Sequence, residues 1–489
     1  MSTKKKSTLT YCAAIDLGAT SGRVMLGRWD GKRLELTEAH RFPNALRTMG
    51  GHDYWDVAGL WEQVVAGLRK AVALLPEGDV LASVGVDTWG VDHVLVDATG
   101  RPVYPTFAYR DNRTQKGLKA LAENPKDLAQ VYAATGIPNV FYNASLQLAE
   151  TVAKHPSIVE LAKHCLFLPD YFNFLLSGRM ANEITVASTT QLLGVHTLDW
   201  SPAALTHFGI PASWFAKPVL AGTQLGPVSG LDFLPNTEVV VVPGHDTASA
   251  YDAMPAAPTG DDLFISSGTW SLVGFESETP VLGEGALAAR ISNERCGDGR
   301  YRPLTNVIGL WLLEGIMKDF ASRPKTDAEW ADLIADAEKL PAPAGLLDVA
   351  DPTFANPPSM KAAIDAQIVS RSLPQPQSLA AYTRLICDSL GQGHADAKTA
   401  FERMSGRSFN RILMVGGGSR NRLLCQATAN ASGIPVVSFA LEGSAVGNLA
   451  SQLVSLGAVE SLSAFRALLG PTLKPEIYAP KLEPVLCGT

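Results

Sequence analysis

Three short loops rich in glycine and hydroxyl residues constrain the fold of this chain more than any other feature. They span Asp16–Arg23, Ser266–Ser271 and Gly416–Asn421, and each directly follows an apolar run that predicts a β-strand. Glycines let the backbone approach a ligand closely, and hydroxyl and N–H groups donate to phosphate oxygens. Because the loops lie far apart in the sequence, one fold has to bring them together around one ligand. This arrangement is typical of a two-domain ATP-binding cleft.

The length and composition agree with two ordinary globular domains. The chain has 489 residues, whereas single hydrophobic cores stop growing at roughly 250–300 residues. Hydrophobic residues make up 46% of the chain and charged residues 18%, which provides enough apolar surface for both cores. The net charge is −7, and Lys4–Lys6 is the only basic run. We therefore expect neither nucleic acid nor a membrane as a partner, and a small-molecule or protein ligand instead.

The N-terminus and the cysteines point to the cytoplasm. Residues 1–10 are interpreted as a loose tail, because the apolar stretch after the lysines is short and is broken by Asp16 and Arg23. No window reaches the roughly 20 apolar residues that span a bilayer. The six cysteines are scattered, with no Cys-x-x-Cys motif, which argues against a zinc site or a disulfide scaffold.

Periodicity predicts an α/β fold in the first half of the chain. Strands over 11–15, 22–28 and 33–42 form an antiparallel meander with the first glycine loop at its first bend. The remaining elements are a helix over 57–75, a strand over 80–86, a helical and loop-rich region over 127–205 and a buried strand over 239–242.

An Ala-, Pro- and Gly-rich stretch over 255–262 marks the predicted boundary between a domain of residues 11–254 and one of 262–480. After it, residues 263–274 resemble the opening of the chain: strand, glycine turn, hydroxyl, strand. Chance similarity between two β-turns is the alternative, whereas a true repeat predicts a duplicated domain. Later elements are helices over 379–402, 422–431 and 444–456 and a strand over 410–415.

The first and third loops are candidate phosphate sites. Successive N–H groups around Gly18–Gly22 would form an anion-binding concavity, and Arg23 adds a cation; an ordinary β-hairpin turn is the alternative. Gly416–Gly418 opens a helix after a strand, where backbone can face a nucleotide. A Rossmann site is the weaker interpretation, because the spacing is not G-x-G-x-x-G and no acidic residue lies about 20 positions further on.

The best candidate for catalysis is the segment Gly244–Ala250. Asp246 lies just past a buried strand, at the predicted start of a helix. A carboxylate there suits phosphoryl transfer, where it accepts the proton of an attacking hydroxyl. The alternative is that Asp246 only caps the helix. His245 is a candidate for a hydrogen bond to a substrate hydroxyl, although a lone histidine is more often structural.

Two further polar clusters suggest a sugar ligand. Asp87–Asp92 ends a strand with an indole, a glycine and two carboxylates, and Tyr109–Thr114 concentrates charged donors and acceptors. Carbohydrate sites combine an aromatic face with bidentate polar groups. Surface loops of similar composition are the alternative.

Taken in order, these motifs resemble those of the FGGY carbohydrate kinases. The strings are Ile-Asp-Leu-Gly-Ala-Thr-Ser-Gly-Arg, Gly-Val-Asp-Thr-Trp-Gly-Val-Asp, Ala-Tyr-Arg-Asp-Asn-Arg-Thr, Gly-His-Asp-Thr-Ala-Ser-Ala, Ser-Ser-Gly-Thr-Trp-Ser and Gly-Gly-Gly-Ser-Arg-Asn. The resemblance runs from about Ala13 to Leu469. It implies a two-domain, actin-like and ribonuclease-H-like α/β fold around a cleft for nucleotide and sugar.

The resemblance also implies roles for individual residues. Asp246 would be the proton acceptor, Asp16 would help to hold Mg²⁺, and Asn306 would lie between sugar and nucleotide. The sugar would be held by Gly90, His245, Asp246 and Thr247. ATP would be bound by Ala19, Thr20, Ser21, Gly22, Arg23, Thr269, Gly416, Gly417 and Gly418. The chain departs from the pattern at Glu314, where relatives carry Gln near the nucleotide, and Glu314 is therefore left out of the site.

The activity implied is ATP-dependent phosphorylation of a sugar by a monomer or homodimer. Strings such as Leu166–Phe172 and Asn306–Leu313 favour the branch of the family that acts on L-rhamnulose. Another ketose or polyol kinase is the first alternative, since the ATP machinery is shared. An actin-like ATPase or a sugar-responsive regulator is disfavoured, because no partner-binding insert, helix-turn-helix or basic segment is evident.

Overall fold

The computed structural model describes residues 9–257, 259–439 and 442–481 of the chain, which fold into two compact units. The first unit contains the described residues up to Pro255 together with 276–303 and 442–472, and the second contains 256–275, 304–441 and the described residues from Leu473 on. The chain first passes between the units at Pro255, within the predicted boundary stretch, and later passes between them again. The division into 11–254 and 262–480 stays a prediction. Residues 1–8 of the predicted tail, and Cys487, lie outside the described residues.

The first unit is built on a six-stranded sheet of order β3-β2-β1-β6-β10-β9. Its strands are β1 (Thr10–Leu17), β2 (Ser21–Trp29), β3 (Leu34–Pro43), β6 (Ser83–Thr88), β9 (Gln224–Pro227) and β10 (Glu238–Val240). The first three form an antiparallel meander, as predicted, and β6 runs parallel to both β1 and β10.

The second sheet repeats this topology. Its order is β13-β14-β12-β11-β15-β16-β17. The strands are β11 (Asp262–Ser267), β12 (Trp270–Gly274), β13 (Ser292–Arg295), β14 (Tyr301–Ile308), β15 (Arg411–Val415), β16 (Val436–Ser438) and β17 (Glu476–Tyr478). Like β1, β11 lies between an antiparallel hairpin partner and a parallel strand. The loose sequence repeat therefore coincides with a repeated strand arrangement, as a duplicated domain predicts.

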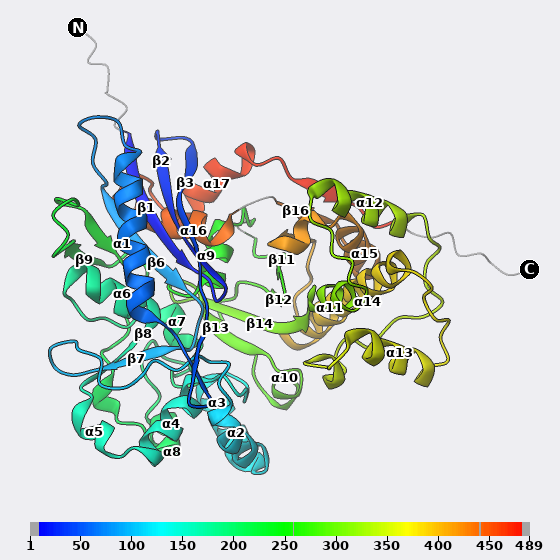
Figure 1. Ribbon diagram of the computed structural model, residues 1–489, viewed down its shortest axis with the longest axis horizontal. Coiled ribbons are helices and arrows are strands. Elements are labelled where there is room, and N and C mark those ends of the chain that lie inside the picture. Colours follow the sequence, from blue (N-terminus) through cyan, green and yellow to red (C-terminus); the bar gives the residue numbers. More distant parts are fainter. Residues whose placement is uncertain (1–8, 258, 440–441, 482–489) are drawn as a thin grey trace, which may run out of the picture. The chain divides into compact units, whose positions relative to one another are not determined.

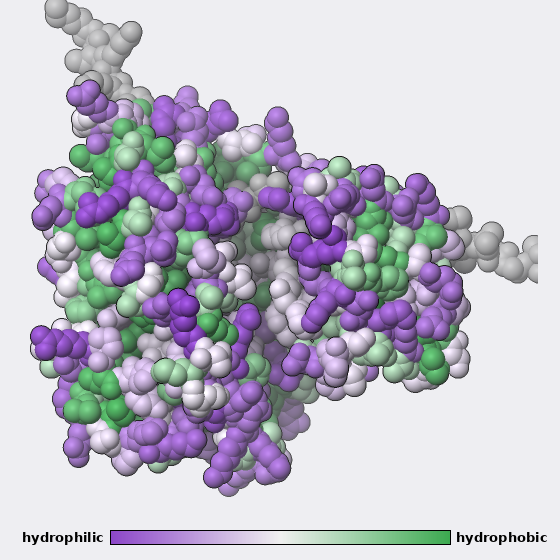
Figure 2. All heavy atoms as spheres, viewed as in Figure 1, coloured by the Kyte–Doolittle hydropathy of each residue, from purple (hydrophilic) through white to green (hydrophobic). Residues whose placement is uncertain are grey.

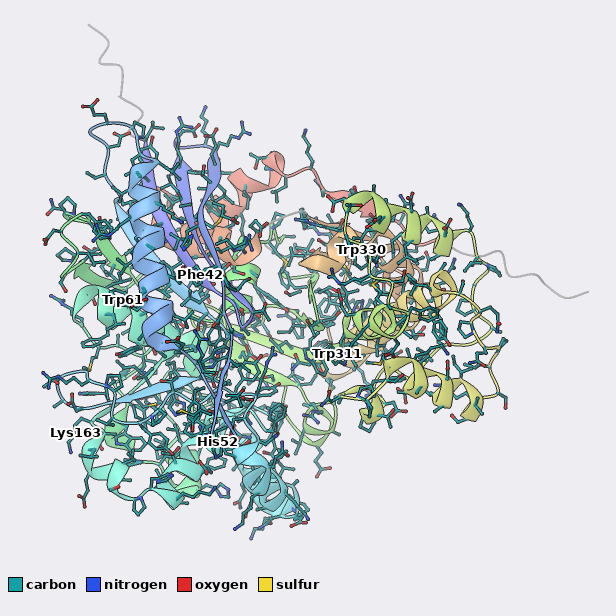
Figure 3. All side chains as sticks on the ribbon, viewed as in Figure 1. Phe42, His52, Trp61, Lys163, Trp311 and Trp330 are labelled. Atoms are coloured by element: carbon teal, nitrogen blue, oxygen red, sulfur yellow. The ribbon has the colours of Figure 1, made fainter. Side chains whose placement is uncertain are left out.

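Helices cover both faces of the first sheet (Figure 1). On one face, α1 (Val57–Ala73) and α6 (Leu168–Ser177) share an apolar core with the strands. Trp61 of α1, which is labelled in Figure 3, stacks on Phe172 of α6. Gly85 of β6 faces the opposite side of the sheet. A Cβ added to Gly85 would lie 2.9 Å from Oδ1 of Asn448, so Asn448 packs on that side. Asn448 belongs to α16 (Gly443–Ser455), which therefore packs on the other face beside α9 (Asp246–Ala253).

The rest of the first unit is mostly helical, as predicted for 127–205. Two small antiparallel sheets accompany these helices. One is a hairpin of β4 (Arg47–Met49) with β5 (His52–Tyr54), and the other pairs β7 (His93–Val96) with β8 (His164–Phe167), which lie far apart in the sequence. The helices are α2 (Gln115–Ala122), α3 (Pro125–Thr135), α4 (Ala144–Lys154), α5 (Ser157–Leu161), α7 (Ile184–Ser188), α8 (Pro202–Phe208), α10 (Glu284–Ala288) and α17 (Leu462–Leu469).

The second unit packs five helices around its own apolar core. They are α11 (Trp311–Asp319), α12 (Asp327–Glu338), α13 (Met360–Ser370), α14 (Leu379–Ser405) and α15 (Arg422–Ser432). The core cluster draws on all five of them. At the crossing of α14 and α15, an added Cβ on Gly391 would lie 2.6 Å from the backbone of Ala427, so glycine is needed for this close approach.

Two predicted boundaries are wrong by a few residues. β6 begins at Ser83 and not at Val80, because Asp79 N–H donates to Pro76 O in a turn and Val80 is exposed. α14 continues to Ser405, three residues beyond the predicted Glu402, and ends at Gly406 in the left-handed conformation (φ +70°).

The surface and the helices show where the apolar residues of the chain lie. On the face shown in Figure 2, hydrophobic residues are interspersed among hydrophilic ones. None of the helices in the described chain is both long and apolar enough to cross a membrane.

Candidate active site

Three of the predicted motifs lie side by side in the first unit, at the carboxyl ends of the parallel strands. Asp16 at the end of β1 is in register with Asp87 at the end of β6. Thr88 forms an isolated parallel bridge with His245, and its N–H donates to Gly244 O over 2.8 Å. In open α/β sheets this edge is where ligands bind.

The first glycine loop is the turn of the β1–β2 hairpin, and it is held from outside by Asn44. Gly18 N–H donates to Ser21 O over 3.0 Å, Asn44 Nδ2 donates to Gly18 O over 3.0 Å, and Asn44 N–H donates to Thr20 O over 2.9 Å. Ala19 and Ser21 are half-buried and Thr20 is exposed. The loop is therefore a β-hairpin turn that leaves Thr20 exposed, and its role as a phosphate site stays a prediction.

Arg23 is surrounded by carboxylates. Its Nε and Nη2 atoms donate to Oδ2 of Asp16 over 2.9 and 2.8 Å, and Nη1 donates to Glu442. Burial raises the pKa of Asp16, and the charge of Arg23 counteracts part of that rise. Glu442 is the more exposed partner, with 43% of its side chain accessible against 8% for Asp16.

Asp87 is completely buried, and only one of its two carboxylate oxygens has a hydrogen-bond partner. Its Oδ2 accepts a 2.6 Å hydrogen bond from Asn448 Nδ2, whereas Oδ1 is buried with no hydrogen-bond partner. Burial, followed by the neighbouring charge of Asp16, raises the pKa of Asp87 well above its usual value.

This pair of carboxylates fits a divalent cation. Oxygen ligands suit Mg²⁺, which usually keeps several of its own waters and binds one or two carboxylates. Among the described residues, no group of three or more His, Cys, Asp or Glu side chains is arranged to hold a metal. The donor set thus fits an ion held by Asp16, by Asp87 or by both, and completed by water.

His245, Asp246 and Thr247 open helix α9, whose start is pinned by a buried carboxylate. Glu183 Oε2 accepts from Gly244 N–H over 3.0 Å and from Thr185 Oγ1 over 2.6 Å, and Thr185 Oγ1 accepts from His245 N–H over 3.1 Å. The N-cap is His245, so the alternative that Asp246 serves as the cap is wrong. The Asp246 side chain is 30% exposed, and its Oδ1 accepts a 3.1 Å hydrogen bond from Thr247 Oγ1.

Sequence reasoning missed two residues that contact this segment. Glu294 of β13 and Arg302 of β14 form a buried ion pair of 2.6 Å, and both approach Nδ1 of His245 at 3.1 Å. Burial would raise the pKa of Glu294, but the charge of Arg302 and the contact with His245 hold it below its usual value. The sequence offered one signal for these two residues, the high density of charged residues in Glu294–Arg302. A charged surface turn has a similar composition, so this signal did not single them out.

Several side chains of the two predicted sugar clusters are held by hydrogen bonds within the protein. The Trp89 indole is buried and its Nε1 donates to Asp92 Oδ2 over 2.9 Å, a carboxylate that also accepts from Trp55 and Gln147. Burial raises the pKa of Asp92 to about 6. In the second cluster, Asp111 accepts from Asp53 N–H and lies 3.0 Å from Nδ1 of His52, which is labelled in Figure 3.

In the first cluster, Gly90 lies at a close contact and precedes a residue with a left-handed backbone conformation. A Cβ there would lie 3.0 Å from Thr189 Oγ1, and the next residue, Val91, adopts φ +68°. A β-branched residue in the left-handed region is strained, and such strain gathers at functional loops.

In the second unit, the other two predicted nucleotide loops meet at the ends of β11 and β15. Ser266 is in register with Val415, and a Cβ on Gly416 or Gly418 would lie 2.5 or 2.1 Å from Ser267. Only glycine permits this contact. The Gly268–Thr269 turn accepts N–H donors from Gly309 and Leu310 at the start of α11.

Asn306 and Glu314 also lie in the second unit. Asn306 is exposed on β14, opposite Leu272. Both oxygens of Glu314 accept from Arg323, over 2.8 and 2.9 Å. The carboxylate of Glu314 is therefore paired with a cation.

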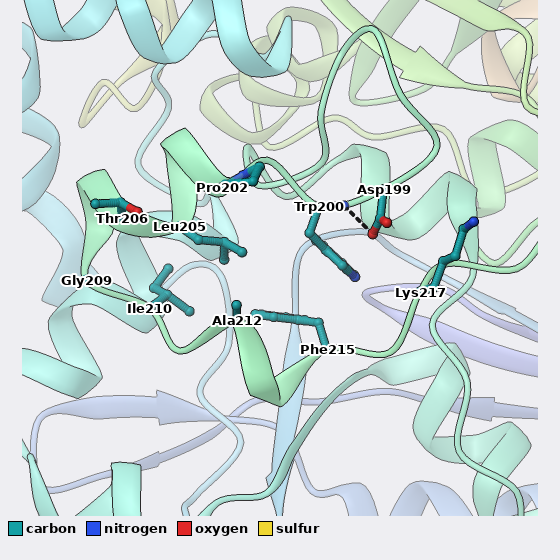
Figure 4. Close-up of a pocket in the computed structure, with 10 residues that line it drawn as sticks. All are labelled: Asp199, Trp200, Pro202, Leu205, Thr206, Gly209, Ile210, Ala212, Phe215 and Lys217. Carbon is teal, nitrogen blue, oxygen red and sulfur yellow. Dashed lines mark hydrogen bonds between the residues drawn. The ribbon is translucent and has the colours of Figure 1, made fainter.

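A separate pocket of 740 Å³ in the first unit contains none of the predicted site residues (Figure 4). It is mainly apolar, with Asp199, Thr206 and Lys217 as its polar side chains. Its lining residues are Asp199, Trp200, Pro202, Leu205, Thr206, Gly209, Ile210, Ala212, Phe215 and Lys217. It provides no carboxylate cluster or glycine loop for phosphoryl transfer.

The fold is the two-domain, actin-like α/β fold of sugar kinases. A xylulose kinase from Rhodospirillum rubrum matches with a TM-score of 0.78 at 19% identity, over 97% of this chain and 94% of that chain. A glycerol kinase from Plasmodium falciparum with ADP matches with a TM-score of 0.80 at 14% identity, over 97% and 95%.

The sequence comparisons are more specific. Residues 11–251 match the N-terminal domain of the FGGY family of carbohydrate kinases, and residues 263–456 match the C-terminal domain. Rhamnulokinases from Enterobacter sp. and Klebsiella pneumoniae are 39% and 40% identical, over 94% of this chain and 93% of theirs. The chain belongs to the FGGY family and is a carbohydrate kinase, and kinases of this family use ATP.

Proposed function

We propose that this kinase transfers the γ-phosphoryl group of ATP to the C1 hydroxyl of L-rhamnulose, giving L-rhamnulose 1-phosphate and ADP in L-rhamnose degradation. The observation that carries the proposal is the partly exposed carboxylate of Asp246, 30% accessible at the start of α9. It follows His245, which forms a bridge with Thr88 at the end of β6. The choice of sugar is supported by the 39–40% identity to rhamnulokinases.

In this reaction, Asp246 accepts the proton of the C1 hydroxyl as its oxygen attacks the γ-phosphorus. The new O–P bond forms while the bond to the bridging oxygen breaks, and ADP leaves with the electron pair. N–H groups of the first loop and the Arg23 guanidinium stabilise the charge that spreads over the phosphoryl oxygens. Mg²⁺, held through Asp16, would neutralise phosphate charge.

The remaining assignments follow the motifs. Gly90, His245, Thr247 and Asn306 would contact the sugar. Ala19–Arg23, Thr269 and Gly416–Gly418 would contact ATP. For Arg23 to reach a phosphate, the phosphate has to compete with Glu442, which is the more exposed of its two carboxylate partners.

The direct test is ADP release from Mg-ATP across L-rhamnulose, L-fuculose, L-ribulose, D-xylulose and glycerol, with a no-sugar control. We expect the highest kcat/KM with L-rhamnulose. Preference for another sugar would reject this substrate and keep the kinase chemistry. Hydrolysis independent of sugar would favour an actin-like ATPase.

A further inference from the structure

A buried chain of three side chains reaches from β14 to the start of α9. Arg302 Nη2 donates to Glu294 Oε2 over 2.6 Å, and the same oxygen lies 3.1 Å from Nδ1 of His245. The side-chain exposures are 0% for Arg302, 9% for Glu294 and 12% for His245, against 30% for Asp246. The exposed fraction of the side chain thus rises from Arg302 through Glu294 and His245 to Asp246, the proposed proton acceptor.

The contacts at Nδ1 decide which ring nitrogen carries the proton. Glu294 Oε2 requires a donor at Nδ1, whereas Arg302 Nη2, also 3.1 Å away, would require an acceptor. Both contacts involve a charged partner, so charge alone does not distinguish them. The geometry favours the carboxylate as the partner of Nδ1, because the same Nη2 of Arg302 lies only 2.6 Å from Glu294 Oε2. Arg302 already makes its shorter bond to Glu294.

The other ring nitrogen supports the same assignment. His245 Nε2 lies 3.6 Å from Asp246 Oδ1, which is longer than a hydrogen bond. A proton on Nε2 would favour a closer approach to this carboxylate. Nε2 therefore makes no hydrogen bond to Asp246 and can accept one from a ligand.

We propose that Glu294, anchored by Arg302, is a positioning residue that holds His245 with its proton on Nδ1 and a lone pair on Nε2. This inference rests on the proposed function, in which His245 contacts the sugar. His245 then accepts a hydrogen bond from one sugar hydroxyl, while Asp246 accepts the proton of the reacting one. The pair selects ketoses whose two hydroxyls fit both acceptors.

The first measurement is NMR of the full-length protein labelled with ¹⁵N-histidine, with His245→Asn to assign the His245 signals. We expect a protonated Nδ1 and an unprotonated Nε2 in the wild type. Glu294→Asp should disturb this state, because the shorter carboxylate retracts from the ring while remaining a charged partner for Arg302. A wild-type ring protonated at Nε2 alone would overturn the proposal.

Sugar kinetics test the consequence. Glu294→Asp should raise KM for the preferred ketose about tenfold and leave KM for ATP unchanged, because Glu294 is coupled to His245 and not to the nucleotide loops. In a His245→Asn background the same change should have no further effect. Ser292→Ala is the matched control, because it removes only the 3.3 Å contact to the other oxygen of Glu294.

The outcomes separate the two claims. If His245→Asn leaves KM for the sugar unchanged, the proposed sugar contact of His245 fails, and the positioning role fails with it. If His245→Asn raises KM but Glu294→Asp adds its full effect in that background, the sugar contact stands and the positioning role is overturned. Glu294→Gln, which leaves Arg302 without a charged partner, reports separately on stability through thermal unfolding.

Discussion

Asp246 is the residue on which the proposed chemistry depends. Asp246→Asn keeps the shape of the side chain and the contact with Thr247 but cannot take up the proton. We expect kcat to fall by about 10²–10⁴, the usual contribution of a general base, while binding of ATP is retained. Steady-state kinetics and nucleotide titration would measure both. Activity equal to the wild type would exclude Asp246 as the base.

Asp87 provides a prediction about pH and stability. The pKa of Asp87 in the folded state lies well above the ordinary value of 3.8. Above pH 3.8 the folded state therefore binds more protons than the unfolded state, and the stability of the protein falls as pH rises. Asp87→Asn removes this loss. We expect the variant to be more stable than the wild type at neutral pH, by on the order of 1–3 kcal/mol, and equal to it below the ordinary carboxyl pKa.

Denaturant unfolding at several pH values would measure the effect. Asp332→Asn is the control, because Asp332 is an exposed carboxylate on α12. A stability difference between Asp87→Asn and wild type that stays constant with pH would contradict the assigned titration of Asp87.

At the scale of elements, α16 is a helix that is hydrogen-bonded to the first sheet through its side chains. Its polar side chains bond to the sheet: Gln452 Nε2 donates to Ala13 O over 2.9 Å and Asn448 Nδ2 to Gly85 O over 3.2 Å. A Cβ on Gly447 would lie 1.7 Å from Ser249 O, on α9. This clash requires the two helices to separate.

Gly447→Ala should therefore destabilise the protein, although alanine favours helices by about 1 kcal/mol over glycine. We expect a net loss of about 3 kcal/mol or more, measured by denaturant unfolding, because the obstacle is backbone and cannot rotate away. Ser444→Ala, in the first turn of the same helix, is the matched control. A stabilised Gly447→Ala would show that propensity outweighs packing at this contact.

At the scale of the whole molecule, the first unit is assembled from three separate parts of the chain. Residues 276–303 supply Glu294 and Arg302, and residues 442–472 supply Glu442 and α16. A fragment ending at Pro255 would expose the buried sheet face that α16 covers.

We expect the fragment of residues 9–255 to lack a cooperative unfolding transition, because its core is incomplete. Circular dichroism during denaturation, compared with the full chain, would measure this. A fragment that unfolds cooperatively, with the stability of the intact protein, would show that the later segments are dispensable for the fold.

The sequence by itself determined the local features of this protein. Glycine and hydroxyl residues after apolar runs predicted loops that the structure places at strand ends. Alternation predicted the meander of β1–β3, and the position of Asp246 after a buried strand predicted the start of α9. These features depend on neighbouring residues, whose spacing can be read directly.

Only the tertiary structure decided which distant segments meet. The return of α16 to the first sheet, the contact of Glu294 with His245, and the hydrogen bonds of Trp55 and Gln147 to Asp92 all join residues far apart in sequence. Periodicity reports which face of an element is apolar, but it does not report what covers that face. Isolated polar residues such as Asn448 and Glu294 acquire their roles only when folding buries them beside a partner.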